Sequence, residues 1–577
     1  MPIRLLPPDV IDQIAAGEVV ERPASVVKEL VENAVDAGAR HVFVRLEGGG
    51  IDLVEVTDDG GGIAPEELAL ALGRHQTSKL GAIDELAGIS SFGFRGEALP
   101  SIASVSRLQI ASRPPGRSGG MLIEAAGGRP LAPTPIAMSH GTRVSVRDLF
   151  RQVPARRKFL LPPPAEARRV IAVLERMAMA APQVAFSLSL DGQEALRTSG
   201  SGNLSEVFAD LFGVEVAENL VPVDARADLG RVQGLVSRPG RDRGNRQWQF
   251  LVIGGRPVET GRLRYAIEAA YQGRLLKGRF PVFCLRLEVP AGDVDVNVHP
   301  AKLEVRLRRE REVASLLHDA VAAALSFQPR SVPAPSTVAG AAPPPVTGDT
   351  APPSAAEVAA GAQAPLFALA EEVERYGRAP GVEGAQESLG EAPAALGQAG
   401  GLFLVAADRD AIYLFDQHAA HERVHYEQLE LQEVRAAQML LSPLVVRLSA
   451  LESQTLGEHL EHLVRYGFEV EHFGDRDVLV RAVPRLFGRE ASPSLLPELL
   501  DALAQGGEGP IEREERVRRE LAACRASVKE HDRLSPIEQQ SLIRQLWNCR
   551  EPRFCPHGRP TYLRLGYDEL RQRFLRR

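Results

Sequence analysis

Residues 28–39 alternate apolar and polar side chains with the period of an α-helix, and Gly38 stands where such a helix would end. Within this segment Glu29, Asn33 and Asp36 occupy positions i, i+4 and i+7, so the three polar groups share one face. The apolar residues fall on the other faces, where they can pack against a sheet. The pattern predicts a half-buried helix that presents two carboxylates and an amide on one side.

Strand-like runs at residues 42–46 and 53–56 follow this helix, and the second run leads into Asp58-Asp59-Gly60-Gly61-Gly62. Residues 92–99 contain a glycine-bearing loop that runs into another helix, and Gly141-Thr142-Arg143 precedes a further strand-like run. Glycines at a strand end allow the backbone to approach a flat ligand closely.

The pattern divides the 577 residues into several parts, in keeping with a chain too long for a single core. Residues 1–210 hold the motifs above, and residues 211–325 contain short strands and helical stretches typical of a second α/β domain. Residues 326–390 are dominated by Pro, Ala, Gly and Ser without any period, which predicts a flexible linker. A globular pattern resumes over 391–577 and includes an α/β insertion at 441–520.

Composition and charge narrow the class of protein. The net charge of −7 and pI near 6.1 show no global preference for nucleic acid, so a DNA site must be a local basic patch. A solvated, salt-bridged face is an equally good interpretation of the basic residues concerned. These residues are Arg238, Arg241, Arg243, Arg246, Arg256, Arg262, Arg264, Arg274, Lys277 and Arg279.

Four cysteines argue against a disulfide scaffold and for a reducing compartment. The N-terminal segment lacks the apolar core of a signal peptide, and no apolar run has the length of a membrane span. We therefore expect a cytoplasmic protein.

The polar face of the first helix suits two tasks at once. The amide oxygen of Asn33 can ligate Mg²⁺ while the carboxylate of Glu29 activates a water. Asp58 can accept a hydrogen bond from an exocyclic amine such as that of adenine. The loop at 92–99 can hold an anion through backbone N–H groups and the positive helix end. The alternative is a surface helix with solvated charges, and the absence of a Walker pattern argues against a P-loop enzyme.

In this order and spacing, the four motifs resemble the ATP site of the gyrase, Hsp90, histidine kinase and MutL superfamily. Residues 11–20 and the Asn-Val-His-Pro-Ala-Lys run at 297–302 narrow the resemblance to the MutL family of DNA mismatch-repair ATPases. The match covers nearly the whole chain outside the linker. Two positions depart from the family pattern: Asp59 replaces its usual Asn, and Ile253-Gly254-Gly255-Arg256 replaces its usual Val-Asn-Gly-Arg.

The resemblance implies an α/β multidomain fold. Its parts are an N-terminal α/β sandwich ATPase of the gyrase/Hsp90 type, a transducer-like second α/β domain, a flexible linker, and an α/β C-terminal domain for dimerisation and nuclease activity. It supports Glu29 as the catalytic base and Asn33 as the Mg²⁺ ligand, and it assigns Lys302 to the γ-phosphate of ATP. A point cation from a neighbouring domain feels ATP and ADP differently, which suits a switch, although a plain surface lysine is the alternative. The other implied nucleotide contacts are Asp58, Gly60, Gly62, Thr77, Ser78, Lys79, Gly93, Phe94, Arg95, Gly96 and Thr142.

The C-terminal part contains a second set of candidate ligands. A strand at 411–415 leads into residues 416–427, in which the segment after Gln417 is predicted to be helical and carries His and Glu side chains on one face. Imidazole, thiolate and carboxylate groups together suit Zn²⁺ or a similar transition metal. The candidate metal ligands are His418, Glu422, Cys524, Cys555 and His557.

This set resembles the metal-dependent endonuclease site of the MutL homologues that nick DNA themselves, whose pattern is satisfied at Asp416, Glu422 and Glu427. The resemblance makes Asp416 and Glu422 catalytic, with Zn²⁺ at a tight site, Mn²⁺ at a weaker one, or both. A structural zinc is the alternative, but such sites are closed by four clustered Cys or His ligands, whereas this set includes carboxylates. Cys284 and Cys549 are interpreted as small core residues.

The linker contains Gln363-Ala364-Pro365-Leu366-Phe367, which resembles peptides that dock on the bacterial replicative sliding clamp, with a chance match as the alternative. The family resemblance further implies a homodimer that works with DNA and a MutS-type mismatch-recognition protein, at the nucleoid and without a membrane. Two functions remain open. One is an ATP-gated endonuclease of mismatch repair; the other is an ATP-driven matchmaker whose C-terminal metal is structural.

Overall fold

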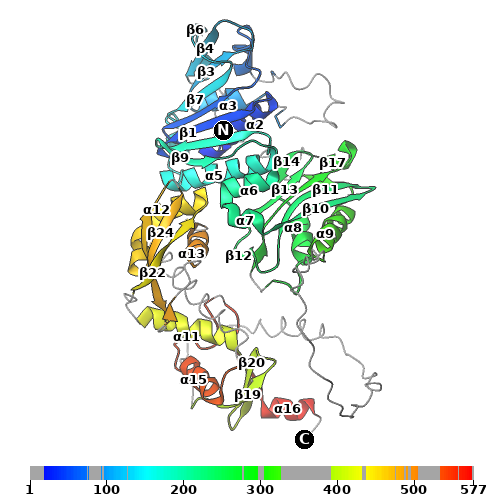
Figure 1. The fold of residues 1–577 in the computed structure, drawn as a ribbon, viewed down its shortest axis with the longest axis vertical. Helices are drawn as coiled ribbons and strands as arrows, with labels where there is room; N and C mark the ends of the chain where they lie inside the picture. Colours follow the sequence, from blue (N-terminus) through cyan, green and yellow to red (C-terminus); the bar gives the residue numbers. More distant parts are fainter. Residues whose placement is uncertain are drawn as a thin grey trace, which may run out of the picture.

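The computed structural model describes residues 19–73, 76, 92–93, 96–126, 128–275, 279–295, 305–326, 391–431, 437–474, 476–486, 489–490, 495–504, 533–556 and 558–574. Helices and sheets alternate throughout these residues (Figure 1), so the predicted α/β multidomain class is confirmed.

A nine-stranded sheet forms the first domain, in the order β5-β4-β3-β7-β2-β1-β8-β9 with β6 beside β4. β1 is antiparallel to β2 and parallel to β8, so a long crossover containing several other strands separates neighbours in the sheet. The strands are β1 (His41–Glu47), β2 (Leu53–Asp58), β3 (Arg107–Arg113), β4 (Gly120–Ala126), β5 (Arg129–Pro130), β6 (Thr134–Ile136), β7 (Gly141–Arg147), β8 (Ala185–Leu190) and β9 (Gln193–Arg197).

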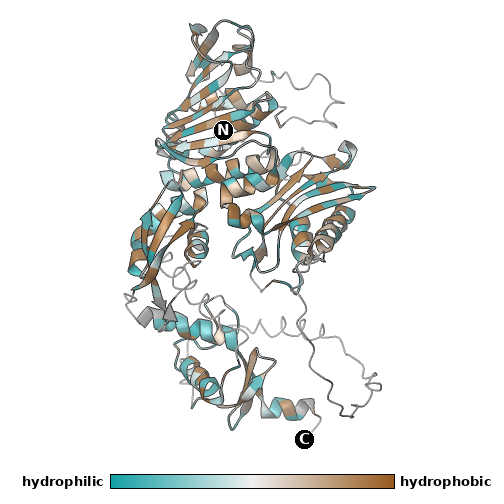
Figure 2. Ribbon diagram, viewed as in Figure 1, coloured by the Kyte–Doolittle hydropathy of each residue, from teal (hydrophilic) through white to brown (hydrophobic). Residues whose placement is uncertain are grey.

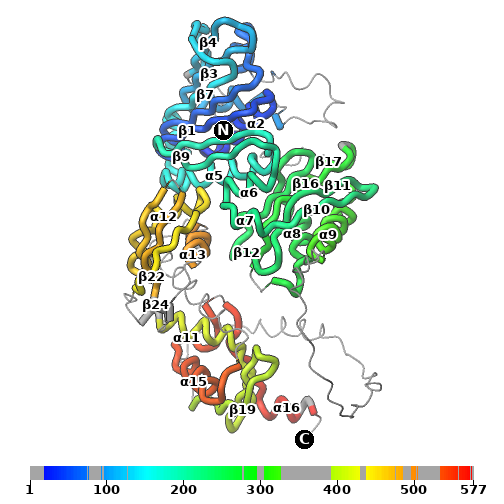
Figure 3. The backbone as a smooth tube through the Cα atoms, in the orientation of Figure 1, coloured from blue at the N-terminus to red at the C-terminus, as the bar shows by residue number. Residues whose placement is uncertain are grey.

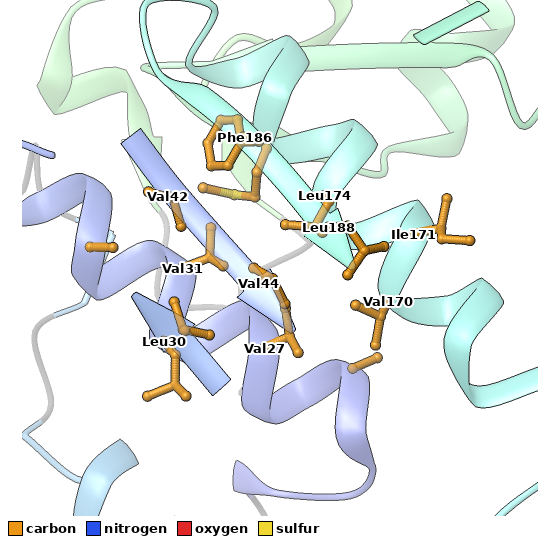
Figure 4. Close-up of a cluster of buried hydrophobic side chains, with 14 of the residues drawn as sticks. Val27, Leu30, Val31, Val42, Val44, Val170, Ile171, Leu174, Phe186 and Leu188 are labelled. Carbon is orange, nitrogen blue, oxygen red and sulfur yellow. The ribbon is translucent and has the colours of Figure 1, made fainter. Parts of the chain in front are cut away.

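Two helices pack on one face of this sheet and create the main core. Buried and exposed residues alternate along β1, so Val42 and Val44 point to the same side of the sheet. There they lie in one apolar cluster with Leu30 of α2 and Leu174 of α5 (Figure 4). Pro23 at the first turn favours the start of α2, because its missing N–H has no helical partner there. The helices of this domain are α2 (Pro23–Asp36), α3 (Ala98–Ser104), α4 (Pro154–Arg157), α5 (Pro163–Ala180), α6 (Leu204–Phe212) and α7 (Val214–Glu218).

The second domain contains a five-stranded sheet, β10-β11-β16-β13-β14, with α8 and α9 packed over its own apolar cluster. It joins the first domain through shared aromatic packing: Trp248 lies in the first core and stacks on Phe212 with ring centroids 4.2 Å apart. Its elements are β10 (Leu220–Ala227), β11 (Gly230–Ser237), β12 (Asp242–Arg243), β13 (Gln249–Ile253), β14 (Arg256–Val258), α8 (Gly261–Ala269), β15 (Phe280–Pro281), β16 (Phe283–Glu288), β17 (Val294–Asp295), β18 (Arg306–Leu307) and α9 (Glu310–Ser326).

The C-terminal part has two sheets, each with its own core. The four-stranded sheet β19-β20-β21-β26 packs against α11 and α15, and β22, β24, β23 and β25 form a separate sheet covered by α12 and α13. Elements of the first are β19 (Ala394–Ala399), β20 (Phe403–Ala407), β21 (Ala411–Asp416), α11 (Gln417–Leu431), α15 (Pro536–Trp547), β26 (Tyr562–Gly566) and α16 (Tyr567–Arg573). Those of the second, here called the inserted subdomain, are β22 (Ala437–Arg447), α12 (Ala450–Arg465), β23 (Glu469–His472), β24 (Asp477–Leu486), β25 (Arg489–Glu490) and α13 (Leu495–Ala504).

Apolar residues run along the strands of each sheet and along the sides of the helices that meet them (Figure 2). The backbone tube shows the inserted subdomain beside α5, with the sheet of β19–β21 farther toward the C-terminal end of the molecule (Figure 3). Among the described residues, no helix combines the length and the apolar character needed to cross a membrane.

Candidate functional site

Helix α2 holds the first candidate residues at the edge of the core. Its apolar side is buried, and Glu29, Asn33 and Asp36 lie half-buried on the opposite side. The Lys28 ammonium lies 2.7 Å from the Glu32 carboxylate and 3.5 Å from the Glu29 carboxylate, so it spans both acids. Glu32 is 3% exposed and was not recognised from the sequence, where its spacing looked like that of an ordinary helical charge.

Asp36 fixes the start of the glycine-bearing loop. Its two carboxylate oxygens accept the backbone N–H groups of Phe92 at 2.8 Å and Gly93 at 3.0 Å. Gly96 takes a positive φ of 63°, and a Cβ there would lie 2.4 Å from the carbonyl oxygen of Gln76, so glycine is required at this crossing. The expected contacts Thr77, Ser78, Lys79, Phe94 and Arg95 lie outside the described residues.

Asp58 ends β2 among groups that also belong to the predicted nucleotide set. Its carboxylate accepts the N–H of Gly60 at 2.9 Å, and in the sheet it is the registered partner of Thr142. Burial raises the pKa of Asp58 to about 6, although hydrogen bonds from the Gly60 and Thr142 backbone oppose that rise. The structure therefore brings Asp58, Gly60 and Thr142 together at one end of β2 and β7.

Glycines allow the chain to pass close to Asp58. Gly141 has φ of 115°, and a Cβ at this position would lie 1.9 Å from the Asp58 carbonyl oxygen. Gly62 has φ of 66°, and its Cβ would lie 2.7 Å from the carbonyl oxygen of Arg113. A larger side chain at Gly141 would push β7 away from β2, and one at Gly62 would displace the chain from the end of β3.

Asp59, the departure from the family pattern, is bound by residues at the start of β1. Its carboxylate accepts the backbone N–H groups of Arg40 at 2.7 Å and His41 at 2.9 Å, and it lies 2.7 Å from the His41 ring nitrogen Nδ1. Burial acts to raise the pKa of Asp59, but the hydrogen bonds from His41 and Arg40 outweigh it and hold the pKa below its usual range. The residue has a local structural role at the start of β1.

Arg256 crosses from the second domain to the loop that Asp36 holds. It is 4% exposed, and its Nη1 donates to the carbonyl oxygen of Phe92 at 3.3 Å. Burial lowers the pKa of Arg256, while the nearby carboxylates of Glu32 and Asp36 act in the opposite direction. A buried position beside two acids does not suit a surface patch for DNA, which was one interpretation of this arginine. Lys302, the expected partner of the γ-phosphate, lies outside the described residues.

Several other arginines of the candidate basic patch are engaged in ion pairs, as the salt-bridge interpretation expects. Arg246 binds Glu268 at 2.7 Å and Arg262 binds Glu310 at 2.7 Å. Arg241 lies 3.0 Å from Glu215. Arg243 and Arg279 reach carboxylates of the inserted subdomain. These contacts satisfy the charges that a phosphate backbone would otherwise attract.

In the C-terminal part, β21 delivers Asp416 to the first turn of α11. The Asp416 carboxylate accepts the N–H of Ala419 at 2.9 Å, a helix cap that fixes the side chain at the strand–helix junction. One turn on, the His418 Nε2 lies 3.0 Å from the Glu422 carboxylate, whose side chain is only 3% exposed. Asp416, His418 and Glu422 therefore all lie at or near the start of α11.

The segment containing Cys555 lies against the same helix. Arg423 of α11 donates through Nε to the carbonyl oxygen of Phe554 at 2.6 Å, and Cys555 is buried. Helix α11 thus contributes imidazole and carboxylate groups, and a loop packed on it contributes a thiol; these are donor types that transition metals bind. Cys524 and His557 lie outside the described residues, and within the described part no group of three or more His, Cys, Asp or Glu side chains is arranged to hold an ion.

Glu427, the last acid of the endonuclease pattern, supports this loop instead. Its carboxylate accepts the backbone N–H groups of Arg550 at 2.8 Å and Glu551 at 3.2 Å. Cys549 donates its thiol to the carbonyl oxygen of Gln545 within α15, and burial raises its pKa to about 12. Burial also raises the pKa of Cys284 to about 12, so both thiols are protonated at neutral pH and fit the role of small core residues.

Among the described residues, α11 and α15 pack on one face of the sheet behind α11. Tyr413 and Phe415 point into the core with α11 and α15, whereas Val405, Leu414 and Leu563 form a row on the opposite face. Leu563 is 50% exposed. A row of apolar side chains across three strands is typical of a surface that another protein surface covers.

Three family models match the chain. Residues 21–123 match the histidine kinase-, DNA gyrase B- and HSP90-like ATPase, residues 208–326 match the C-terminal domain of DNA mismatch repair protein, and residues 396–534 match the MutL C terminal dimerisation domain.

The chain is also similar to complete relatives. It is 41% identical to the DNA mismatch repair protein MutL of Desulforudis audaxviator, over 100% of this chain and 99% of that protein. It is 39% identical to MutL of Symbiobacterium thermophilum, with 100% of both chains covered. Among solved structures, the Aquifex aeolicus MutL ATPase domain complexed with ADP is 30% identical, covers 47% of this chain and 93% of its own, and has a TM-score of 0.37.

Proposed function

Because the chain belongs to the MutL family of DNA mismatch repair proteins, we propose that it is an ATP-driven repair switch that nicks DNA at a C-terminal metal site. Its N-terminal part is an ATPase domain of the gyrase, Hsp90 and histidine kinase type. The observation that supports nicking is the gathering of Asp416, His418 and Glu422 at the start of α11, with the Cys555 segment packed on the same helix.

We take the working units to be residues 1–210 for the ATPase, 211–325 for the transducer-like domain and 391–577 for the C-terminal domain with its insertion, joined by 326–390. In the ATPase, Asp58 would accept the exocyclic amine of adenine, with Gly60 and Thr142 beside it. Glu29 would orient and deprotonate the attacking water, since its carboxylate lies on the same helical face as Asn33. Asn33 would hold Mg²⁺, which neutralises phosphate charge when bound.

The loop beside α2 would hold the phosphates. Asp36 ties Phe92 and Gly93 to the helix, and Arg256 ties the same loop to the second domain. Contact from Lys302 would make this second domain sensitive to the γ-phosphate. The remaining expected phosphate contacts are Thr77, Ser78, Lys79, Phe94, Arg95 and Gly96.

At the nuclease site, His418, Glu422, Cys524, Cys555 and His557 would hold Zn²⁺, Mn²⁺ or both, and a bound ion would polarise the scissile phosphate. Asp416 would orient this group, because its carboxylate is already fixed by the Ala419 N–H. The apolar row of Val405, Leu414 and Leu563 would pair two chains into a homodimer, as the dimerisation-domain match suggests.

The remaining partners follow from the family. DNA would be the substrate, a MutS-type protein would signal the mismatch, and Gln363-Ala364-Pro365-Leu366-Phe367 would dock on the sliding clamp. The work would take place in the cytoplasm, at the nucleoid.

The test is nicking of supercoiled plasmid with Mn²⁺ by the wild-type protein and by Asp416→Asn. Asparagine is also a good helix cap, so this variant should keep α11 intact while losing the carboxylate charge. We expect loss of nicking with ATPase activity unchanged. If the wild-type protein does not nick once contaminating nucleases are removed, it is instead an ATP-driven matchmaker whose C-terminal metal is structural. If Asp416→Asn nicks as fast as the wild type, the nicking does not depend on Asp416 and the proposed site is wrong.

A further inference from the structure

The inserted subdomain packs into the N-terminal half of the molecule. Ala450 and Leu451, at the start of α12, are buried in the same apolar cluster as Trp248 and Phe250 of the second domain and the core of the first. Helix α12 lies directly against α5, which Figure 1 shows at the lower edge of the first domain. The contact therefore buries apolar side chains as well as bringing charged groups together.

Charges of one sign face charges of the other across this contact. Arg168 on α5 lies 2.6 Å from Glu458 on α12, and their side chains are 11% and 22% exposed. Arg279, beside β15, lies 3.4 Å from Glu498 on α13. Complementary charges of this kind set the orientation of a contact, and removal of one partner leaves the other poorly solvated.

Arg243 pairs with two buried carboxylates of the inserted subdomain. It lies 3.2 Å from Glu452 and 3.0 Å from Asp501, whose side chains are 3% and 5% exposed. Its guanidinium sits 3.5 Å above the centre of the Trp248 ring, an attraction that holds the side chain in place before any carboxylate arrives. Glu452 is likewise fixed, because its other oxygen accepts the N–H of Ser449 at 2.7 Å in a capping box.

The inserted subdomain also supplies a cation in the other direction. Arg476 donates to the carbonyl oxygens of Asp210 and Leu211, the latter at 3.1 Å. Both carbonyls belong to the last turn of α6, where helical carbonyls lack partners within the helix and the dipole favours a positive charge. Each side of the contact therefore donates arginine side chains to the other. The contact is not a simple pairing of one basic surface with one acidic surface.

These contacts reach two domains at once. Arg168 and the end of α6 belong to the first domain, whereas Arg243 and Arg279 belong to the second. A rigid body bound to both can keep its full set of ion pairs at only one relative orientation of the two domains. Any ligand that changes that orientation must weaken the contact, and by linkage the contact must oppose the ligand.

We propose that the inserted subdomain is an internal docking module that binds the junction of the first and second domains of its own chain. Its charged and apolar contacts hold the two N-terminal domains in one orientation and place the C-terminal part under their control. The contacts above support the docking by themselves. We add that binding of ATP releases the inserted subdomain, and only this step rests on the proposed function of the nucleotide site.

Hydrogen exchange of α12 amides in the full-length, nucleotide-free protein tests the docking. Arg168→Glu and Glu458→Arg each place like charges together and should speed exchange about tenfold, the scale of coupling between contacting charges. The double variant restores opposite charges and should return exchange to the wild-type rate. Arg481→Glu is the matched control, because Arg481 pairs with Glu471 inside the same subdomain. Unchanged exchange in both single variants, or no recovery in the double variant, overturns the proposal.

Two further outcomes are distinct. Carbodiimide crosslinking is carried out on a mixture of isotopically labelled and unlabelled Arg168→Lys protein. It should join residue 168 to Glu458 within one chain. Links only between a labelled and an unlabelled chain contradict docking in the same chain. A non-hydrolysable ATP analogue should speed α12 exchange in the wild type. If the charge variants behave as expected but the analogue has no effect, the docking stands and its control by ATP is wrong.

Discussion

Asp58 is the residue where binding and stability oppose each other most directly. Its carboxylate lies at the buried end of β2, and burial raises its pKa from 3.8 to about 6. A pKa raised in the folded state means that the protein loses stability as pH rises through the range from about 4 to 6, because the folded form must then bury a charge. At neutral pH the site keeps a carboxylate that is ready to accept an amine hydrogen.

Asp58→Asn should therefore stabilise the nucleotide-free protein and weaken ATP binding. A rise in pKa from 3.8 to about 6 corresponds to about 3 kcal/mol above pH 7, and the gain should shrink as the pH falls below about 6 and disappear below about pH 3, where Asp58 is protonated in both states. The measurement is the thermal midpoint of the nucleotide-free chain at pH 4.5 and pH 8, with calorimetric titration of ATP at pH 8. A stability gain that is the same at both pH values would show that the carboxylate charge is not its cause.

Glu29 is proposed to deprotonate the water that attacks ATP, and its surroundings suggest that it can be replaced without disturbing the fold. Glu29→Ala leaves the buried side of α2 unchanged and leaves Lys28 paired to Glu32. We expect ATP binding to persist and hydrolysis to slow by about 10² to 10⁴, the usual contribution of a general base. Steady-state ATPase and nucleotide binding should be measured beside Glu66→Ala, which removes an exposed carboxylate of the same domain. Equal turnover in the two variants would remove Glu29 from the mechanism.

Local periodicity was sufficient to predict several elements. The helix expected from the spacing of Glu29, Asn33 and Asp36 is α2, and the run expected to follow the strand at 411–415 is α11. Asp58 and Thr142 lie together because β2 pairs with β7, a strand far from β2 in the sequence. Such pairings depend on the whole sheet, so motif order could suggest them only through the family resemblance.

The contacts that the sequence did not reveal join residues far apart in the chain. Arg256 reaches Phe92 across 164 positions, and Glu427 holds the backbone at Arg550 across 123 positions. Periodicity carries no information about such contacts, because it reports only which face of an element is buried. Arg256 and Arg243 therefore looked like surface cations, although the structure buries both against carboxylates.

At the scale of elements, the sheet of β19, β20, β21 and β26 predicts how two chains meet. Its inner face is filled by α11 and α15, and its outer face offers Val405, Leu414 and Leu563 in one row. Leu414→Glu should abolish the dimer, because a charge at the centre of the row would be desolvated without a partner. Arg544→Glu on the exposed side of α15 is the control. Sedimentation at micromolar concentration should give a monomer for the first variant and a dimer for the second; a dimeric Leu414→Glu protein would place the interface elsewhere.

At the scale of the whole molecule, the second domain is placed to transmit the state of the nucleotide site, ATP or ADP, to the rest of the chain. It contacts the loop beside α2 through Arg256, shares the aromatic packing of Trp248 and Phe212 with the first domain, and meets the inserted subdomain through Arg243. A cation from this domain that binds only the γ-phosphate would change the position of the domain between the ATP and ADP states. Lys302 is the residue assigned that contact.

Lys302→Ala should then separate the two nucleotides. Affinity for a non-hydrolysable ATP analogue should fall by about tenfold or more, the scale of a charge-assisted hydrogen bond, while affinity for ADP stays unchanged. The full-length variant should also lack the faster α12 hydrogen exchange that the analogue produces in the wild type, measured side by side. Lys302→Arg keeps the charge and should recover part of both effects, which excludes a general loss of folding. Equal losses of ATP-analogue and ADP affinity would mean that Lys302 supports the site without sensing the γ-phosphate, and the switch would have to act through another group of the second domain.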